Sequence, residues 1–315
     1  MTGLRGIIPY LPTPLCASPS GSGAGARVDA QAVSRLVFHV LRAGVDGLSP
    51  LGSTGEVMYL TPEQRVDMVH ATVAASRDFA RAQGTSPVPV IAGVAAFSIE
   101  GIRQQIVHYE AARAAGFVVI MQRYFPLTDA EQYAFYAAAA QATDLPIVVY
   151  SNPLLGATIT PDLAQRLTAI PNVRYIKDAS GKTGTLLSIQ NRVGDRFGIF
   201  AASAHIPAAV FELGGIGWMA GPACVAPHAA VALWRSWGRR DRSRMWQIQR
   251  AMWPLNEMFS QYSAAAFIKF ALNEQELHVG VPCPPQSAIS GTAAESVRAR
   301  LKAVARDLNE LSLTL

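Results

Sequence analysis

The stretch FVVIM at residues 117–121 is apolar at every position, and PIVVY at residues 146–150 nearly repeats the pattern. A strand with one face in water alternates apolar and polar residues, whereas an uninterrupted apolar run is typical of a strand that is buried on both faces. Strands of that kind occur in parallel sheets that are covered by helices. The two runs therefore predict a parallel sheet inside a layer of helices.

Similar short runs recur up to residue 220. We expect eight strands, at Gly6–Leu11, Gly47–Pro50, Val88–Gly93, Phe117–Met121, Pro146–Tyr150, Val173–Lys177, Gly198–Ala201 and Ile216–Ala220. Helix starts stand between them: Thr61-Pro62 and Thr160-Pro161 place a capping threonine before a proline, and Thr128 precedes Glu131 with the spacing of a capping box. Eight such alternations favour an α/β fold of the (β/α)8 TIM barrel type over an open sheet with a second domain.

Only helices are expected after residue 222. We predict Ala226–Gly238, Met245–Tyr262, Ala264–Asn273 and Ala293–Leu311, with a proline-rich turn at Val279–Pro285. The predicted organisation is a barrel catalytic domain at residues 1–222 and a C-terminal helical segment, residues 223–315, packed on the barrel. Residues 17–26, which are rich in Gly and Ser, are predicted to form the most flexible loop.

Composition excludes several classes of protein. Half of the 315 residues are apolar and only 16% are charged, which suits a large buried core and excludes a disordered chain. Three widely spaced cysteines (Cys16, Cys224 and Cys283) indicate reduced thiols rather than a disulfide framework. The sequence has no CxxC pair and no Cys/His cluster, so we expect no metal site. Because it also lacks a GxGxxG after the first strand and a Walker loop, we expect no cofactor.

The net charge of +5 raises the question of nucleic acid. The one dense basic run, Arg235–Arg250, is interpreted as a solvated helical face, so we expect no nucleic-acid partner. The beginning of the sequence has no signal-peptide pattern, and no run of about 18 apolar residues occurs. We therefore expect a cytoplasmic protein without a membrane partner.

Lysine is scarce among the basic residues. Only four of the 27 are lysines: Lys177, Lys182, Lys269 and Lys302. Lys177 ends the apolar strand VRYIK, which would bury its stem and place its amine at the barrel mouth. Burial favours the neutral amine, which can attack a carbonyl and form a Schiff base, whereas arginine cannot. The alternative is an ion pair with Asp178. The other three lysines are expected to be solvated or in surface ion pairs, and Lys269 is the one of them for which burial is the alternative.

Further polar residues follow the predicted strands, where barrel enzymes place their active sites. Tyr150 ends the strand beside Lys177 and could transfer protons, although a packing role is the alternative. The turn Gly52-Ser53-Thr54-Gly55-Glu56 offers two hydroxyls and several N–H groups to a carboxylate, or is an ordinary glycine turn. Tyr124 also follows a strand, and its alternative is packing too.

The combination of GSTGE at 52–56, Tyr150 and IKDASG at 176–181 resembles the dihydrodipicolinate synthase / N-acetylneuraminate lyase family of class I aldolases. The resemblance runs from about Gly3 to the C-terminal helices, and includes Thr13-Pro14 and GGIG at 214–217. It implies that Lys177 forms the Schiff base with a 2-oxo acid such as pyruvate and that Tyr150 moves protons.

The resemblance implies further roles. Ser53 and Thr54 correspond to the hydroxyl pair that binds the substrate carboxylate, with Thr54 also part of the proton relay. Tyr124 corresponds to a tyrosine that reaches into the neighbouring subunit's site, and Met219 to an apolar residue near the substrate. Homotetramers built from tight dimers are usual in the family, so a homotetramer is implied.

Two departures narrow the substrate. Family members that act in lysine biosynthesis carry a carboxylate-binding arginine five residues after the strand-end tyrosine, where this sequence has Leu155. An apolar side chain cannot pair with a carboxylate. Residues 201–205 also offer little to a polyol chain, which disfavours a sialic acid substrate. The second substrate is expected to be less polar. The polar contacts still available to it are Arg123, Asn152, Ser203 and His205, of which Arg123 stands where many relatives have a second tyrosine.

We therefore predict a Schiff-base lyase or aldolase acting on pyruvate or a related 2-oxo acid. One alternative is a dehydratase or aldolase of 2-keto-3-deoxy sugar acids, which would use the same Lys177 and Tyr150. Another is a protein that binds 2-oxo acids without turnover. A metal-dependent barrel aldolase is disfavoured, because of the six histidines only His205 stands at a strand end.

Overall fold

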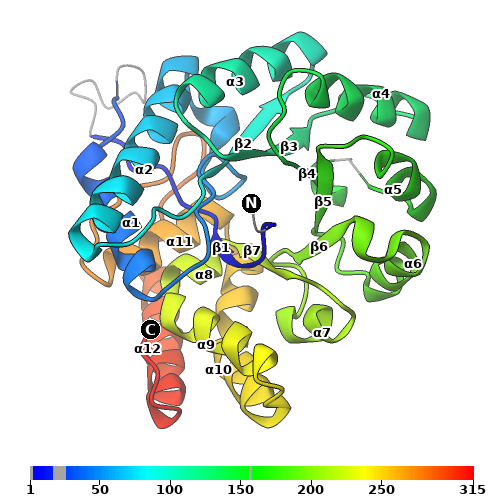
Figure 1. Cartoon of the computed structure of the whole chain (residues 1–315). Helices are drawn as coiled ribbons and strands as arrows, with labels where there is room; N and C mark the ends of the chain where they lie inside the picture. The colour runs from blue at the N-terminus through cyan, green and yellow to red at the C-terminus, as the bar shows by residue number, and fades with distance from the viewer. Residues whose placement is uncertain (1–2, 17–25, 156–157) are drawn as a thin grey trace.

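Seven parallel strands curl into one sheet in the order β1-β7-β6-β5-β4-β3-β2, with helices around the outside (Figure 1). The structure is a computed structural model that describes residues 3–16, 26–155 and 158–315. The loop prediction at 17–26 lies outside these residues except for Ala26. The strands are β1 Gly6–Pro9, β2 Ile91–Ala96, β3 Gly116–Met121, β4 Ile147–Ser151, β5 Val173–Asp178, β6 Gly198–Ala201 and β7 Gly217–Ala220.

The gap between β1 and β2 is closed by a short extended segment. Leu48 forms a parallel bridge with Val90, and Ser49 forms one with Tyr10. Ser49 N donates to Pro9 O at 3.0 Å, and Ile91 N donates to Leu48 O at 2.8 Å, so hydrogen bonds leave the segment on both sides. The strand predicted at Gly47–Pro50 is therefore two isolated bridges rather than a regular strand. It ends early because Leu51 turns into the left-handed region at φ 63°.

Three of the barrel helices begin at capping residues that the sequence predicted. Thr61 and Thr128 each form a capping box, with Gln64 and Glu131 respectively, and Thr160 caps the next such helix through its side chain. The barrel helices are α1 Ala30–Arg42, α2 Pro62–Gln83, α3 Ile99–Ala111, α4 Asp129–Ala140, α5 Pro161–Leu167, α6 Thr183–Val193 and α7 Pro207–Glu212. Short 3-10 turns follow at Val57–Tyr59, Pro153–Leu155 and Gly194–Arg196.

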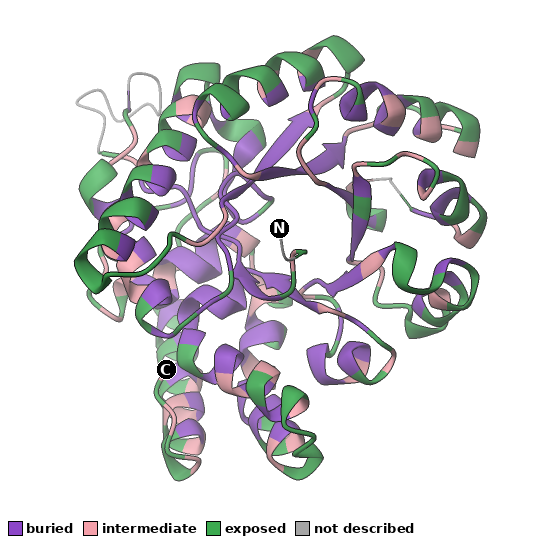
Figure 2. Cartoon of the chain, viewed as in Figure 1, coloured by how far each residue is buried: buried purple, intermediate pink, exposed green. Residues whose placement is uncertain are grey.

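Burial explains the apolar runs. Every residue of β3 and β4 is buried, because side chains on one face fill the barrel and those on the other meet the helices. Figure 2 shows the strands mostly buried, while the outer faces of the surrounding helices are largely exposed. Among these buried strands, the carboxyl ends of β4 and β5 carry the polar residues that matter below.

The regular elements after β7 are all helices, as predicted. They are α8 Pro222–Val225, α9 Pro227–Gly238, α10 Arg242–Gln261, α11 Ala264–Asn273 and α12 Gly291–Glu310. Helix α9 contacts β1 and α1, α10 packs against α9 and α12, and α11 packs against α8 (Figure 1). We propose that the chain divides into a barrel at 1–222 and a helical segment at 223–315. Helix α9 of that second segment packs directly on the barrel.

Candidate active site

The Lys177 amine lies between two aromatic rings near the carboxyl end of β5. The side chain is 3% exposed, and its Nζ lies 3.7 Å from the centroid of the Tyr10 ring and 4.0 Å from that of Tyr150. Burial lowers the pKa of this amine well below its ordinary value, while the charge of Asp178 opposes the shift. The amine is therefore available in its neutral, nucleophilic form at lower pH than an exposed lysine.

Tyr150 sits beside Lys177 because the two residues are paired across β4 and β5. Its side chain is 5% exposed, and Asn152 Nδ2 donates to its hydroxyl oxygen at 3.0 Å. Burial raises the pKa of Tyr150 to about 12, against the hydrogen bonds of Ser53 and Asn152, which lower it. The phenol therefore keeps its proton at neutral pH and can donate it.

The loop of residues 52–56 brings its hydroxyls to the same place. Ser53 is exposed and lies near enough to the Tyr150 hydroxyl to lower its pKa, whereas Thr54 is 2% exposed. Thr13 Oγ1 donates to Gly55 O at 2.7 Å and so holds the loop against the segment after β1. A Cβ at Gly55 would lie 2.8 Å from Leu51 N, so this position requires glycine. The turn is thus a packed part of the barrel mouth.

Tyr10 was missed by the sequence analysis. It is 1% exposed, its ring covers the Lys177 amine, and burial raises the pKa of its phenol well above the ordinary value. A Cβ at Gly52 would lie 2.4 Å from a Tyr10 ring carbon, so the first glycine of the loop makes room for this ring. The available signal was its position near the end of the first predicted strand, which is the same kind of position as that of Tyr150 in a later strand.

Asp178 is paired with His205 and not with Lys177 among the described ion pairs. His205 Nε2 lies 2.7 Å from Asp178 Oδ1, which also accepts from the Ser180 hydroxyl at 2.6 Å. Burial would raise the pKa of Asp178, but its hydrogen bonds with His205, Ser180 and Ser151 outweigh this and lower it. Because neighbouring residues in a strand face opposite ways, Asp178 points away from the Lys177 side of the sheet. The pair braces the loops after β5 and β6.

The other predicted residues differ in burial and contacts. Tyr124 is 85% exposed and stacks edge-on against Phe125, so within one chain it does not join Lys177. Arg123 and Ser203 are half-buried, and Ser203 O accepts from Asn256 Nδ2 at 2.8 Å. Met219 is fully buried in β7. Direct substrate contacts by these residues and by His205 stay predictions.

Leu155 occupies a half-buried place in the turn after β4 and packs against the hydrophobic core. All three cysteines lie in the described part of the chain, and none is disulfide-bonded. Across residues 3–16, 26–155 and 158–315, no three His, Cys, Asp or Glu side chains are grouped so as to hold a metal ion. Within the same ranges, none of the helices is both long and apolar enough to cross a bilayer.

The model of the dihydrodipicolinate synthetase family matches residues 5–304. The chain belongs to this family. Members include lyases and aldolases, and the chain is accordingly a lyase-type enzyme of that family. A 4-hydroxy-tetrahydrodipicolinate synthase of Phenylobacterium zucineum is 28% identical over 305 residues, which are 96% of this chain and 97% of that protein.

Two further relatives extend the comparison. An L-threo-3-deoxy-hexylosonate aldolase of Hypocrea jecorina is 27% identical and aligns with 82% of this chain and 84% of that one. The solved structure of the prophage protein YagE of E. coli K12, in complex with pyruvate, matches 95% of this chain and 98% of its own with a TM-score of 0.84 at 24% identity. This structural likeness supports the barrel fold.

Proposed function

We propose that this dihydrodipicolinate synthetase family protein catalyses aldol cleavage or condensation of a 2-oxo acid through an imine on Lys177. The observation that carries the proposal is the buried amine with a lowered pKa, stacked between Tyr10 and Tyr150. The aldolase from Hypocrea jecorina and the pyruvate complex of the E. coli protein support the same chemistry. Leu155 argues against an aldehyde substrate whose own carboxylate must be bound at that place.

The reaction follows from what each side chain can do. Ser53, Thr54 and the loop N–H groups bind the carboxylate, and the lone pair of Lys177 Nζ attacks the keto carbon. The former keto oxygen takes one proton from Tyr150 and one from the attacking nitrogen, and it leaves as water when the protonated C=N bond forms. Tyr150, now deprotonated, takes the proton of the substrate hydroxyl that becomes the aldehyde oxygen. The bond between that hydroxyl-bearing carbon and the carbon next to the imine carbon then breaks, its electron pair passes to the protonated imine to give an enamine, and the aldehyde product departs. Protonation of the resulting enamine carbon and addition of water release the 2-oxo acid and the free amine.

Borohydride reduction in the presence of pyruvate is expected to attach the pyruvate skeleton irreversibly to Lys177. Peptide mapping by mass spectrometry measures the site. The trapping rate should decline as the pH falls through the lowered pKa of Lys177, at a lower pH than for an exposed lysine, because protonation removes the nucleophilic lone pair. Labelling elsewhere, for example on exposed Lys182, or no labelling in a screen of 2-oxo acids, contradicts the proposal. Binding without turnover would instead favour a non-catalytic protein.

We further propose a homotetramer, made of two tight dimers, in which Tyr124 enters the neighbouring site. Apolar side chains are exposed on loops after neighbouring strands: Tyr124 is 85% exposed, Phe125 is 72% exposed and Leu154 is 94% exposed. Such a group of exposed apolar side chains marks an interaction surface. If a second copy of the chain covers this surface, Tyr124 of one copy would lie near Tyr150 of the other copy.

Mixed oligomers test this arrangement. We expect Lys177→Ala and Tyr124→Phe chains to be impaired alone, and to recover activity after subunit exchange, because one site in a mixed dimer receives both intact groups. Lys177→Ala mixed with Tyr150→Phe is the control and should not recover, since both residues serve the site of their own chain. Sedimentation of the wild type as a monomer, or no recovery in the first mixture, contradicts the proposal.

A further inference from the structure

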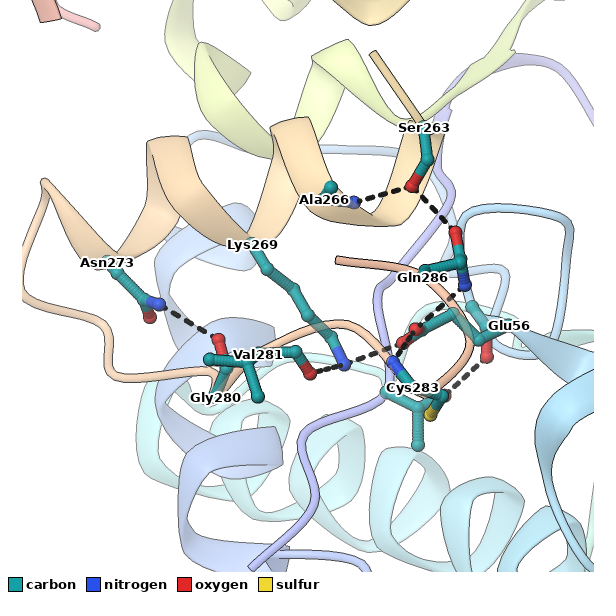
Figure 3. A network of polar contacts seen from close by, with 11 residues as sticks. Glu56, Ser263, Ala266, Lys269, Asn273, Gly280, Val281, Cys283 and Gln286 are labelled. Atoms are coloured by element: carbon teal, nitrogen blue, oxygen red, sulfur yellow. Dashed lines mark hydrogen bonds and ion pairs between the residues drawn. The ribbon is translucent and has the colours of Figure 1, made fainter. Parts of the chain in front are cut away.

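Glu56, the last residue of the loop 52–56, is buried against the C-terminal helices (Figure 3). Its side chain is fully buried, and Oε2 lies 2.6 Å from Lys269 Nζ of α11, whose side chain is 1% exposed. Among the described residues, Oε2 has no other polar partner. Oε1 accepts from Cys283 N at 2.5 Å and from Gln286 Nε2 at 3.3 Å. Every polar contact of this carboxylate among the described residues is therefore made with the C-terminal part of the chain.

The partners of Glu56 are fixed to one another. Lys269 Nζ also donates to Val281 O at 2.8 Å, which ties α11 to the segment of residues 279–286. The Ser263 hydroxyl, which caps α11, donates to Gln286 Oε1 at 2.6 Å (Figure 3). Farther along α11, Asn273 Nδ2 donates to Gly280 O at 2.9 Å. Helix α11 and residues 279–286 thus form one bracket around the carboxylate of Glu56.

The loop needs this support. Leu51 and Glu56, one residue before the loop and its final residue, both have left-handed backbone conformations, with φ of 63° and 60°. Residues other than glycine adopt this region at a cost and hold it only where surrounding contacts require it. Thr13 secures Gly55 from the β1 side. The Glu56 bracket holds the next residue, so the loop is anchored at two adjacent positions directly after Ser53 and Thr54.

We propose that the buried Glu56–Lys269 ion pair positions Ser53 and Thr54 to bind the substrate carboxylate, so that the C-terminal helices set the affinity for the 2-oxo acid. The inference rests on the proposed function, because it concerns the carboxylate site of that reaction. Glu56 and Lys269 are positioning residues: each acts on the substrate through the loop. Lys177 lies on β5, away in sequence from both the loop and α11. Its capacity to form an imine should therefore survive when the Glu56–Lys269 pair is broken.

A charged pair at this place makes a specific prediction about variants. Removing one partner of a buried ion pair leaves an uncompensated charge, whereas removing both charges together does not. Single substitutions should therefore disturb the loop more than a double substitution that replaces both groups with neutral side chains. Such non-additivity is expected for residues in direct contact.

The experiment measures borohydride trapping on Lys177 as a function of pyruvate concentration. For Lys269→Met and Glu56→Gln we expect the half-saturating concentration to rise at least about tenfold, with the trapped yield at saturation near that of wild type, since lost ground-state binding moves the saturation point. In the double variant the half-saturating concentration should lie closer to wild type than in either single variant. Gln286→Leu removes one hydrogen-bond donor to Glu56 and should raise the half-saturating concentration by a smaller factor. This variant tests the inference if Lys269→Met and Glu56→Gln fail to fold.

Two controls separate positioning from general destabilisation. Lys302→Met removes an exposed lysine of α12 and should leave the saturation curve unchanged. Leu301→Ala weakens the buried packing of the same helix, so it should lower the melting temperature without shifting half-saturation. Unchanged half-saturation in Lys269→Met, Glu56→Gln and Gln286→Leu, or an equal shift in Leu301→Ala, overturns the inference. If wild-type protein itself traps no 2-oxo acid, the proposed function fails instead.

Discussion

Replacing Lys177 with alanine is expected to reduce turnover by about 10⁴-fold or more, the range found when a covalent nucleophile is removed. The described structure offers no second amine at this place: Lys182 and Lys302 are exposed, and Lys269 is committed to Glu56. The loss should appear in kcat, because no imine forms whatever the substrate concentration. Steady-state kinetics with any active 2-oxo acid, together with borohydride trapping, measures it.

The Lys177 prediction has two matched controls. Lys177→Met keeps the length of the side chain in its aromatic enclosure, so it should fold at least as well as wild type while remaining inactive. Lys182→Ala removes the nearest exposed lysine in the sequence and should retain wild-type rates. If the Lys177→Ala enzyme keeps its rate, or if Lys182→Ala is the inactive variant, the imine mechanism is wrong.

Tyr150→Phe is expected to lower kcat by about 10²- to 10⁴-fold, the usual contribution of a positioned general acid or base. The phenylalanine ring keeps the stacking on the Lys177 amine at 4.0 Å, so the fold and the lysine environment should be preserved. Only the proton donor is lost. Without it the hydroxyl of the first adduct leaves slowly, so the rate of imine trapping should fall while the final yield is retained. Rapid-quench trapping distinguishes rate from yield.

Tyr136→Phe is the matched control for Tyr150→Phe. Tyr136 is also fully buried, and its hydroxyl donates to the backbone oxygen of Tyr150 at 3.5 Å rather than facing the amine. Its removal should leave kcat within about threefold of wild type. Equal losses in the two variants would show that any buried tyrosine hydroxyl near β4 matters for packing, and would remove Tyr150 from the proposed proton transfer.

The sequence predicted most of the frame because local patterns carry it. Uninterrupted apolar runs marked β3 and β4, the threonine caps marked α2, α4 and α5, and the predicted helix Ala264–Asn273 has the same limits in the structure. Gly47–Pro50 was the exception, since its hydrogen bonds depend on both neighbours and its run ends at Leu51. Lys177 could also be selected as the candidate nucleophile from the sequence, because a lysine at the end of a buried strand is unusual.

The residues that complete the site were harder to predict. Tyr10 meets Lys177 only when the sheet curls and brings β1 across from β5, and a strand-end aromatic looks like any packing residue in the sequence. The pairing of His205 with Asp178 was likewise not predicted, while its contact with a substrate stays a prediction. Glu56 appeared to be the last residue of a glycine turn, and its partner Cys283 lies 227 positions away.

By itself, the sequence determined which segments are strands and helices and which lysine stands at a strand end, because periodicity, caps and burial depend on neighbouring residues. The tertiary structure alone decided which side chains face one another: Tyr10 over Lys177, Asp178 with His205, and Glu56 with Lys269. The physical reason is that closing the barrel and folding the C-terminal helices back onto it bury side chains from distant parts of the chain together. A group that stays charged there, such as Glu56, needs a partner from another segment.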